Sequence, residues 1–206
     1  TPGDRKVFQR LVREGRLFEI RDWVGRGRPA RFLVGPSQRT VTALDIAVSS
    51  GIHSLVQMLL EGVNWTDCEK SEALARAIWD RKRYLIDLLL AHDAPATHVD
   101  FDSACKLGDV AFLEQLVALG VDPTEGDAFA SALIEFPAKP LLRFYKQNHE
   151  RIEGLDEQLC IALIDSIGER HIKGSILLLW AGADPARRVP DKPRRKFPGY
   201  KDPAHR

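Results

Sequence analysis

The sequence predicts an all-α protein, a solenoid of about six helical hairpins whose β-hairpin fingers are short or absent. A large apolar residue, a small residue and a helix-ending residue recur at fixed distances from six anchor positions. Stacked hairpins of this kind bury a continuous core that one hairpin cannot form alone. The anchors are Gly15, Gly51, Arg81, Gly108, Phe136 and Arg170, spaced by 36, 30, 27, 28 and 34 residues.

An apolar stripe marks the first helix of each unit. Residues seven before the anchor are large and apolar, those four before it are mostly small, and those three before it are mostly apolar. Spacings of three and four place these residues on one face of a helix. The three sets are Phe8, Leu44, Leu74, Phe101, Phe129 and Leu163; Leu11, Ala47, Ala77, Ala104, Ala132 and Ser166; and Val12, Val48, Ile78, Cys105, Leu133 and Ile167.

The second helix of each unit has its predicted core face at eight and nine residues after the anchor. Its end is marked by residues that tolerate the left-handed conformation of a helix C-terminal cap, and Gly120 is predicted to adopt it. Eight after the anchors stand Trp23, Leu59, Leu89, Leu116, Phe144 and Leu178; nine after stand Val24, Leu60, Leu90, Val117, Tyr145 and Leu179; the predicted caps are Gly27, Gly62, Asp93, Gly120, Asn148 and Gly182.

These slots delimit the units and two irregular segments. Pro137 and Pro140 predict that the second helix of the fifth unit is broken or delayed. Residues 186–206 form a basic, proline-rich segment, which is expected to lie extended along the last unit against Trp180, the alternative being a disordered end. The expected units are residues 4–28, 40–63, 70–95, 98–123, 126–149 and 156–185.

The slots resemble ankyrin repeats over about residues 4 to 185. The likeness is clearest in Thr42–Ala47 followed by Gly51, against the family signature T-P-L-H-x-A, and in the closing phrase Ala181–Pro185. Spacings of 27 and 28 fall below the family's roughly 33 residues, which predicts tight turns in place of fingers between units three, four and five. The signature histidine is replaced throughout, by Gln9, Asp45, Ala75, Asp102, Ala130 and Ile164.

The formal net charge of +1 conceals an uneven distribution. Residues 1–39 carry ten Lys/Arg and four Asp/Glu, residues 186–206 carry eight and two, and residues 40–185 carry twelve and twenty-three. The acidic middle favours a basic protein partner and opposes a nucleic acid. Three cysteines without a close pair favour a reducing compartment, so a cytoplasmic location is expected. No apolar run is long enough for a membrane span.

No known catalytic or cofactor motif occurs, so neither an enzyme, a cofactor, a metal site nor a small-molecule substrate is expected. Gly25–Arg28 could contact a phosphate, but these residues also supply a helix cap and turn. His92 and His98, with Asp100 and Asp102 nearby, could ligate a metal, although their spacing crosses a turn and favours solvated side chains. Cys105 occupies a core position and Cys160 is expected to be partly exposed.

The ankyrin resemblance implies a protein-binding module whose first helices line a concave groove. Trp79 lies off the buried stripe and is expected to be exposed in that groove as a binding anchor. The alternatives are a structural spacer or oligomerisation segment of a larger protein, and a bacterial immunity or adaptor protein. The expected groove residues stand just before each anchor: Ser49, Ser50, Trp79, Asp80, Lys106, Leu107, Ile134, Glu135 and Glu169.

Overall fold

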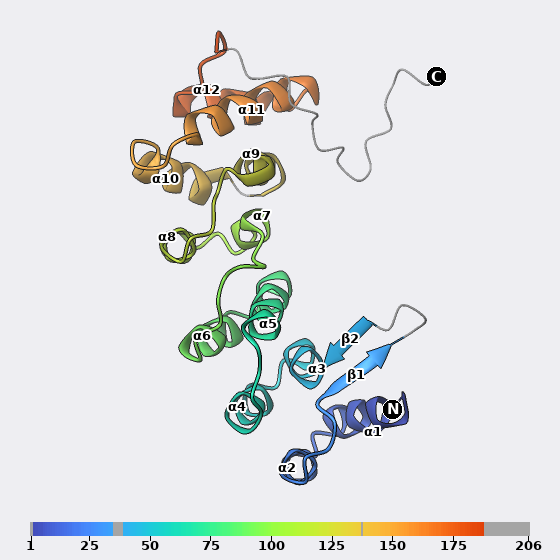
Figure 1. The fold of residues 1–206 in the computed structure, drawn as a ribbon. Helices are drawn as coiled ribbons and strands as arrows, with labels where there is room; N and C mark the ends of the chain where they lie inside the picture. Colours follow the sequence, from blue (N-terminus) through green and yellow to red (C-terminus); the bar gives the residue numbers. More distant parts are fainter. Residues whose placement is uncertain (1, 35–38, 137, 188–206) are drawn as a thin grey trace, which may run out of the picture. The chain divides into compact units, whose positions relative to one another are not determined.

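The computed structural model describes residues 2–34, 39–136 and 138–187 (Figure 1). Within these residues the chain is mostly helical, with twelve α-helices, one 3-10 turn and one two-stranded sheet, as the predicted all-α class requires. The chain divides into two compact units. The first comprises the described residues up to Leu107 together with Ala118–Val121, and the second comprises Gly108–Val117 and the described residues from Asp122 onward.

The first unit contains three pairs of consecutive helices and a seventh helix. Within each pair the two helices pack together; the first helices α1, α3, α5 and α7 also pack in succession, as do the second helices α2, α4 and α6. The elements are α1 (Pro2–Arg13), α2 (Leu17–Gly25), β1 (Arg31–Val34), β2 (Arg39–Thr42), α3 (Ala43–Ser50), α4 (His53–Gly62), α5 (Asp67–Trp79), α6 (Arg83–Ala91) and α7 (Phe101–Cys105).

The second unit repeats the same packing between two complete pairs. Helices α9 and α10 pack together, α11 and α12 pack together, and contacts also join α9 to α11 and α10 to α12. Helix α8 lies mostly in this unit. Its elements are α8 (Val110–Ala118), the 3-10 turn η1 (Glu125–Asp127), α9 (Ala128–Glu135), α10 (Ala138–Asn148), α11 (Leu155–Gly168) and α12 (Ile172–Ala181).

A β-hairpin joins the first two helix pairs. Strands β1 and β2 are antiparallel, with Phe32 opposite Val41. Phe32 is buried, and its ring lies 5.5 Å from that of Phe8, which in turn contacts Trp23. The hairpin therefore adds an aromatic side chain to the core of the first pair. Residues 93–100 and 119–127, which join later pairs, form no strand in the structure, as the short spacings predicted.

The predicted stripe of the first helices forms the core. Every residue seven or four before an anchor is buried, and so is every residue three before it except Ile167, which is 57% exposed. The core face of the second helices was predicted only in part. The positions eight after the anchors are buried, but those at nine are mostly half-buried and Leu179 is 46% exposed. Residues at four and five, such as Leu55, Val56 and Leu85, complete this core face instead.

Five of the six anchors have a left-handed backbone at the end of a first helix, including Arg81 (φ 55°) and Arg170 (φ 60°). Four predicted caps of second helices, Gly120 among them (φ 91°), also have positive φ. The prediction was wrong for Gly62 and Asn148, which lie within α4 and α10. The side-chain amide of Asn148 instead donates to the carbonyl oxygen of Phe144 at 2.9 Å.

The prolines of the fifth pair do not delay its second helix, contrary to expectation. Helix α10 begins at Ala138, two residues after its anchor, as the other second helices do. Pro140 is the third residue of α10, where a backbone N–H has no acceptor within the helix and its loss costs little. Residues 188–206, and with them most of the segment expected to lie against Trp180, are outside the described residues.

Candidate functional site

A groove of about 740 Å³ opens over the first helices of the first unit. Arg5 and Gln9 of α1 lie at one end, and Val99 and Ser103 at the other, with residues of β2, α3 and α5 between them. The groove is lined mostly by positions ten, six, five and two before the anchors. Positions six, five and two lie off the buried stripe, so they fall on the face that each first helix leaves uncovered. Of the residues at ten, only Arg5 lies on a helix, since Val41 is in β2 and His98 precedes α7.

Two of the predicted binding residues, Ser49 and Trp79, line this groove. Trp79 is 59% exposed, as expected. The ammonium group of Lys106 lies 3.8 Å from the centroid of the Trp79 ring, a cation–π distance that orients the indole. Because this contact already orients the exposed indole, the side chain would lose little further conformational entropy on binding a partner.

The other predicted residues are placed differently. The hydroxyl of Ser50 donates to the carbonyl of Ala47 at 2.7 Å, so it is engaged by its own helix. Asp80 forms an ion pair with Lys82 at 3.2 Å. Leu107 is half-buried at the end of the first unit, whereas Ile134, Glu135 and Glu169 belong to the second unit and do not line the groove.

Charges of both signs line the groove. Its cationic groups are Arg5 and Arg76, and its carboxylates are Asp45, Glu72 and Asp100. The Nε atom of Arg5 is buried and has no hydrogen-bond partner. A buried donor without an acceptor lowers the stability of the folded state.

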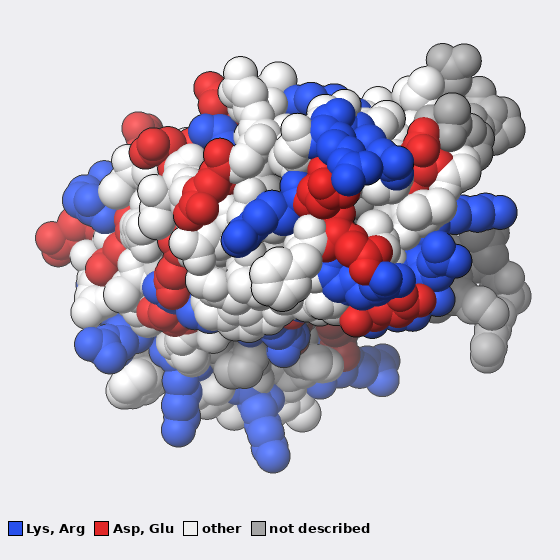
Figure 2. Space-filling model, turned by 90° about the horizontal axis from the view of Figure 1, so that it is seen from below, with Lys and Arg blue, Asp and Glu red and all other residues white. Residues whose placement is uncertain are grey.

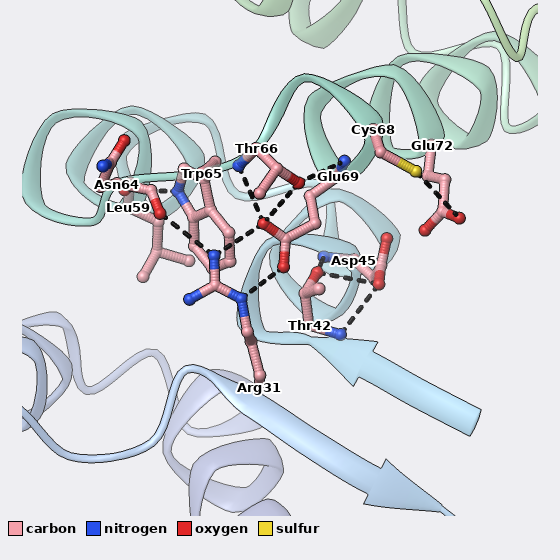
Figure 3. Close-up of polar contacts among 10 residues, drawn as sticks. All are labelled: Arg31, Thr42, Asp45, Leu59, Asn64, Trp65, Thr66, Cys68, Glu69 and Glu72. Atoms are coloured by element: carbon pink, nitrogen blue, oxygen red, sulfur yellow. Dashed lines mark hydrogen bonds and ion pairs between the residues drawn. The ribbon is translucent and has the colours of Figure 1, made fainter. Parts of the chain in front are cut away.

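Two helix caps fix the starts of α3 and α5, two of the helices that line the groove (Figure 3). The hydroxyl of Thr42 accepts from the backbone N–H of Asp45 at 2.9 Å, and the Asp45 carboxylate accepts from the backbone N–H of Thr42 at the same distance. Thr66 and Glu69 form the same reciprocal cap at the start of α5. The S/T-x-x-D/E spacing that encodes both caps is visible in the sequence and went unused in the prediction.

Arg31 of β1 ties the hairpin to the start of α5 (Figure 3). Its guanidinium donates to both carboxylate oxygens of Glu69 and to the backbone carbonyl of Asn64 at 3.1 Å, and it lies 5.3 Å from the centroid of the Trp65 ring. The hydrogen bond from Arg31 is the largest cause that lowers the pKa of Glu69, and the bonds from Thr66 lower it further. The β2 side of the groove is thereby anchored to its α5 side.

The other candidate sites are occupied by structural contacts. Gly27 has the left-handed conformation of a turn. Arg26 pairs with Asp22 at 2.9 Å, and the Arg28 guanidinium lies 4.8 Å from the centroid of the Trp23 ring. These contacts favour the cap interpretation of Gly25–Arg28 over a phosphate site. Among the described residues, no group of three or more His, Cys, Asp and Glu side chains could hold a metal ion. His92 ends α6, whereas His98 lies beside Cys68.

The three cysteines have different surroundings. Cys105 is buried as predicted, and burial raises the pKa of its thiol, with the Asp102 charge as a second cause. The expectation that Cys160 is partly exposed was wrong, since it is only 3% exposed. Helix α11 begins at Leu155, so Cys160 lies in its second turn, within the helix that packs on α9, rather than at a helix end. Cys68 alone of the three is exposed.

No family model, curated protein or solved structure matches the chain. None of the helices in the described part of the chain has the length and hydrophobicity needed to span a membrane.

Proposed function

We propose that the chain is a protein-binding module whose groove over α1, α3, α5 and α7 receives a partner. The observation that carries the proposal is the exposed indole of Trp79 inside this groove. Aromatic side chains in a concave surface supply much of the binding energy of protein interfaces, because burying them removes a large apolar area from water. The proposal assigns binding, and not catalysis, to the groove.

We propose that the chain forms a repeat array of about six ankyrin-like hairpins, and the packing of its helices supports this arrangement. Within each unit, first helices pack on first helices and second helices on second helices, which is the packing expected of stacked hairpins. A stack of this kind leaves one face of every first helix available for a partner. We propose a cytoplasmic location for the module, on the ground that its cysteines are unpaired.

The groove favours a partner segment that carries an apolar side chain between polar groups of both signs. Arg5 and Arg76 can bind carboxylates or carbonyl oxygens, while Glu72 and Asp100 can bind basic side chains. On the face seen in Figure 2, Lys and Arg side chains are likewise interspersed with Asp and Glu side chains. Complementary charges would set specificity and association rate more than affinity.

Replacing Trp79 by alanine tests the proposal. The matched control is Phe18→Ala, because Phe18 is 86% exposed on α2 and does not line the groove. Proteins captured from a lysate of the source organism are compared by quantitative mass spectrometry, and a candidate partner is then purified and titrated. Trp79→Ala is expected to weaken its binding about 30-fold, the size of a hot-spot contact of 2 kcal/mol, while Phe18→Ala leaves it unchanged.

A partner whose affinity is the same for the wild type and Trp79→Ala would place the binding surface elsewhere. Equal losses in both variants would show that exposed aromatic residues bind non-specifically. The unfolding midpoints of both variants are measured beside that of the wild type, and unchanged midpoints assign any loss of binding to the side chain itself.

A second candidate function is self-association through α12. This helix buries only Leu178, and five of its apolar side chains are exposed. A large exposed apolar patch is typical of an interaction site. The exposed residues are Ile172, Ile176, Leu177, Leu179 and Trp180.

Light scattering after size-exclusion chromatography, at several protein concentrations, tests this second function. The mass is expected to rise with concentration for the wild type and to stay at that of one chain for a variant with Ile172→Glu and Ile176→Glu. Phe18→Glu in the first unit is the control. A wild type that stays monomeric at every concentration would contradict self-association.

A further inference from the structure

Cys68 and His98 form an exposed thiol–imidazole pair that the proposed function does not use. The Cys68 Sγ atom lies 3.4 Å from the His98 Nε2 atom and 4.0 Å from a carboxylate oxygen of Glu72. Glu72 lies one helical turn beyond Cys68 on α5, and the two side chains lie side by side in Figure 3. The separation of 30 positions between Cys68 and His98 explains why no motif indicated the pair.

The backbone around His98 is fixed to α5. The backbone N–H of His98 donates to the Ser71 hydroxyl oxygen at 2.9 Å, and the Thr97 hydroxyl donates to the same oxygen at 3.1 Å. Ser71 is fully buried and stands three residues after Cys68 in α5. The imidazole is therefore presented to the thiol by a turn attached to the helix that carries the thiol.

The start of α5 favours an anionic sulfur at Cys68, whereas the Glu72 carboxylate opposes one. Cys68 is the second residue of α5, close to the backbone N–H groups that make a helix N-terminus favourable for anions. The carboxylates on either side of it are already paired: Asp67 with Lys70 at 3.4 Å, and Glu69 with Arg31. Glu72 remains as the carboxylate beside the sulfur.

We propose that Cys68 is a reactive thiol that His98 activates for attack on small disulfides. The His98 Nε2 atom accepts the thiol proton, and the sulfur attacks one sulfur of the disulfide. The disulfide bond breaks as the new S–S bond forms, and the leaving sulfur takes the proton back from His98. A mixed disulfide on Cys68 and one free thiol result, so no further oxidant is needed.

The groove has room for a group attached to Cys68, and burial protects the other two thiols from reaction. His98 and Glu72 line the groove of about 740 Å³, so a small group attached to Cys68 meets open space. Cys105 and Cys160 are buried and do not react while the chain is folded. Thiolation of Cys68 is therefore expected to be selective.

The rate of reaction with a chromogenic aromatic disulfide tests the proposal. Mass spectrometry after short reaction times identifies the modified cysteine, and the full chain is used throughout. Cys68 is expected to react selectively, with a rate at least about tenfold lower in His98→Ala, because the proton acceptor is lost. His98→Gln, which keeps a polar side chain, is expected to be equally slow, and Glu72→Gln is expected to react at least as fast as the wild type.

Three outcomes would overturn the proposal. Equal rates for the wild type and both His98 variants would show that the imidazole does not activate the thiol. A loss in Glu72→Gln as large as that in His98→Ala would make the carboxylate the proton acceptor. Reaction of Cys105 or Cys160 as fast as Cys68 in the wild type would remove the selectivity. In the variants, continued protection of these two buried thiols shows that the fold is intact.

Discussion

Replacing Gly51 by alanine tests how the second and third helix pairs are joined. Gly51 follows α3 with a left-handed backbone (φ 76°), and a Cβ atom added there would lie 2.9 Å from the hydroxyl oxygen of Tyr84. That hydroxyl donates to the Gly51 carbonyl at 2.8 Å. The methyl group would therefore displace the tyrosine and break its hydrogen bond. Gly120 is the matched control, because it also has positive φ and nothing lies within 4 Å of its added Cβ.

The two positions share one energy cost and differ in the other. A left-handed backbone costs a residue with a Cβ about 1–2 kcal/mol, reduced by about 0.4–1 kcal/mol because alanine loses less entropy on folding than glycine. The expected cost of Gly120→Ala is therefore about 1 kcal/mol. Gly51→Ala also loses the Tyr84 hydrogen bond, worth about 0.5–1.5 kcal/mol, and is expected to cost about 2 kcal/mol.

Urea unfolding, followed by circular dichroism and by tryptophan fluorescence, measures both costs. In a Tyr84→Phe background the hydrogen bond is already absent, so Gly51→Ala is expected to cost only about 1 kcal/mol there. The resulting coupling energy of about 1 kcal/mol is the decisive quantity. The same cost for Gly51→Ala in both backgrounds, or no cost at all, would refute the reasoning.

Three further predictions concern the same region. Arg81→Gly is expected to raise the melting temperature, with a gain of about 0.5–1 kcal/mol, because Arg81 has φ 55° without being a glycine. Lys82→Met is expected to lose about 1–2 kcal/mol in urea unfolding, since the Lys82 ammonium donates to two carbonyl oxygens at the end of α3, at 2.8 and 2.7 Å. The partly exposed Arg83 provides the control, since Arg83→Met is expected to lose less than about 0.5 kcal/mol. Arg31 lowers the pKa of Glu69 from its ordinary value of 4.5, so this ion pair stabilises the fold above that pH. Its contribution to the free energy of unfolding is lost as the pH falls through the lower pKa of the folded state. Urea unfolding at a series of acidic pH values should therefore show a smaller loss of stability for Arg31→Met than for the wild type.

The repeated core could be predicted because its signal is local. Phe8, Leu44 and Leu74 stand at the same distance from their anchors, and a spacing of three and four residues places such side chains on one buried face whatever the neighbouring units are. The left-handed conformations of Arg81 and Arg170 were missed. Neither residue favours that conformation, so it is imposed by the turn between two packed helices.

The groove could be predicted only in part. Trp79 and Ser49 were found because they follow the buried stripe closely in sequence. Arg5 and His98 were not, because they reach the groove from segments that only the packing of several helices brings together. The exposed face of α12 was also missed: a stripe such as Leu177–Leu179 indicates burial, whereas burial requires a neighbour to pack against.

The position of the Glu69 carboxylate has a consequence for local opening of the fold. One carboxylate accepts hydrogen bonds from Thr66 at the start of α5 and from Arg31 in a hairpin 38 residues away in sequence. If the hairpin detaches, the first turn of α5 loses a charge-assisted contact at the same moment. Amide protons of the hairpin and of this turn should therefore exchange with solvent through one shared opening. The exposed thiol of Cys68 lies in that turn, so the same opening would also loosen the backbone that holds its sulfur beside His98.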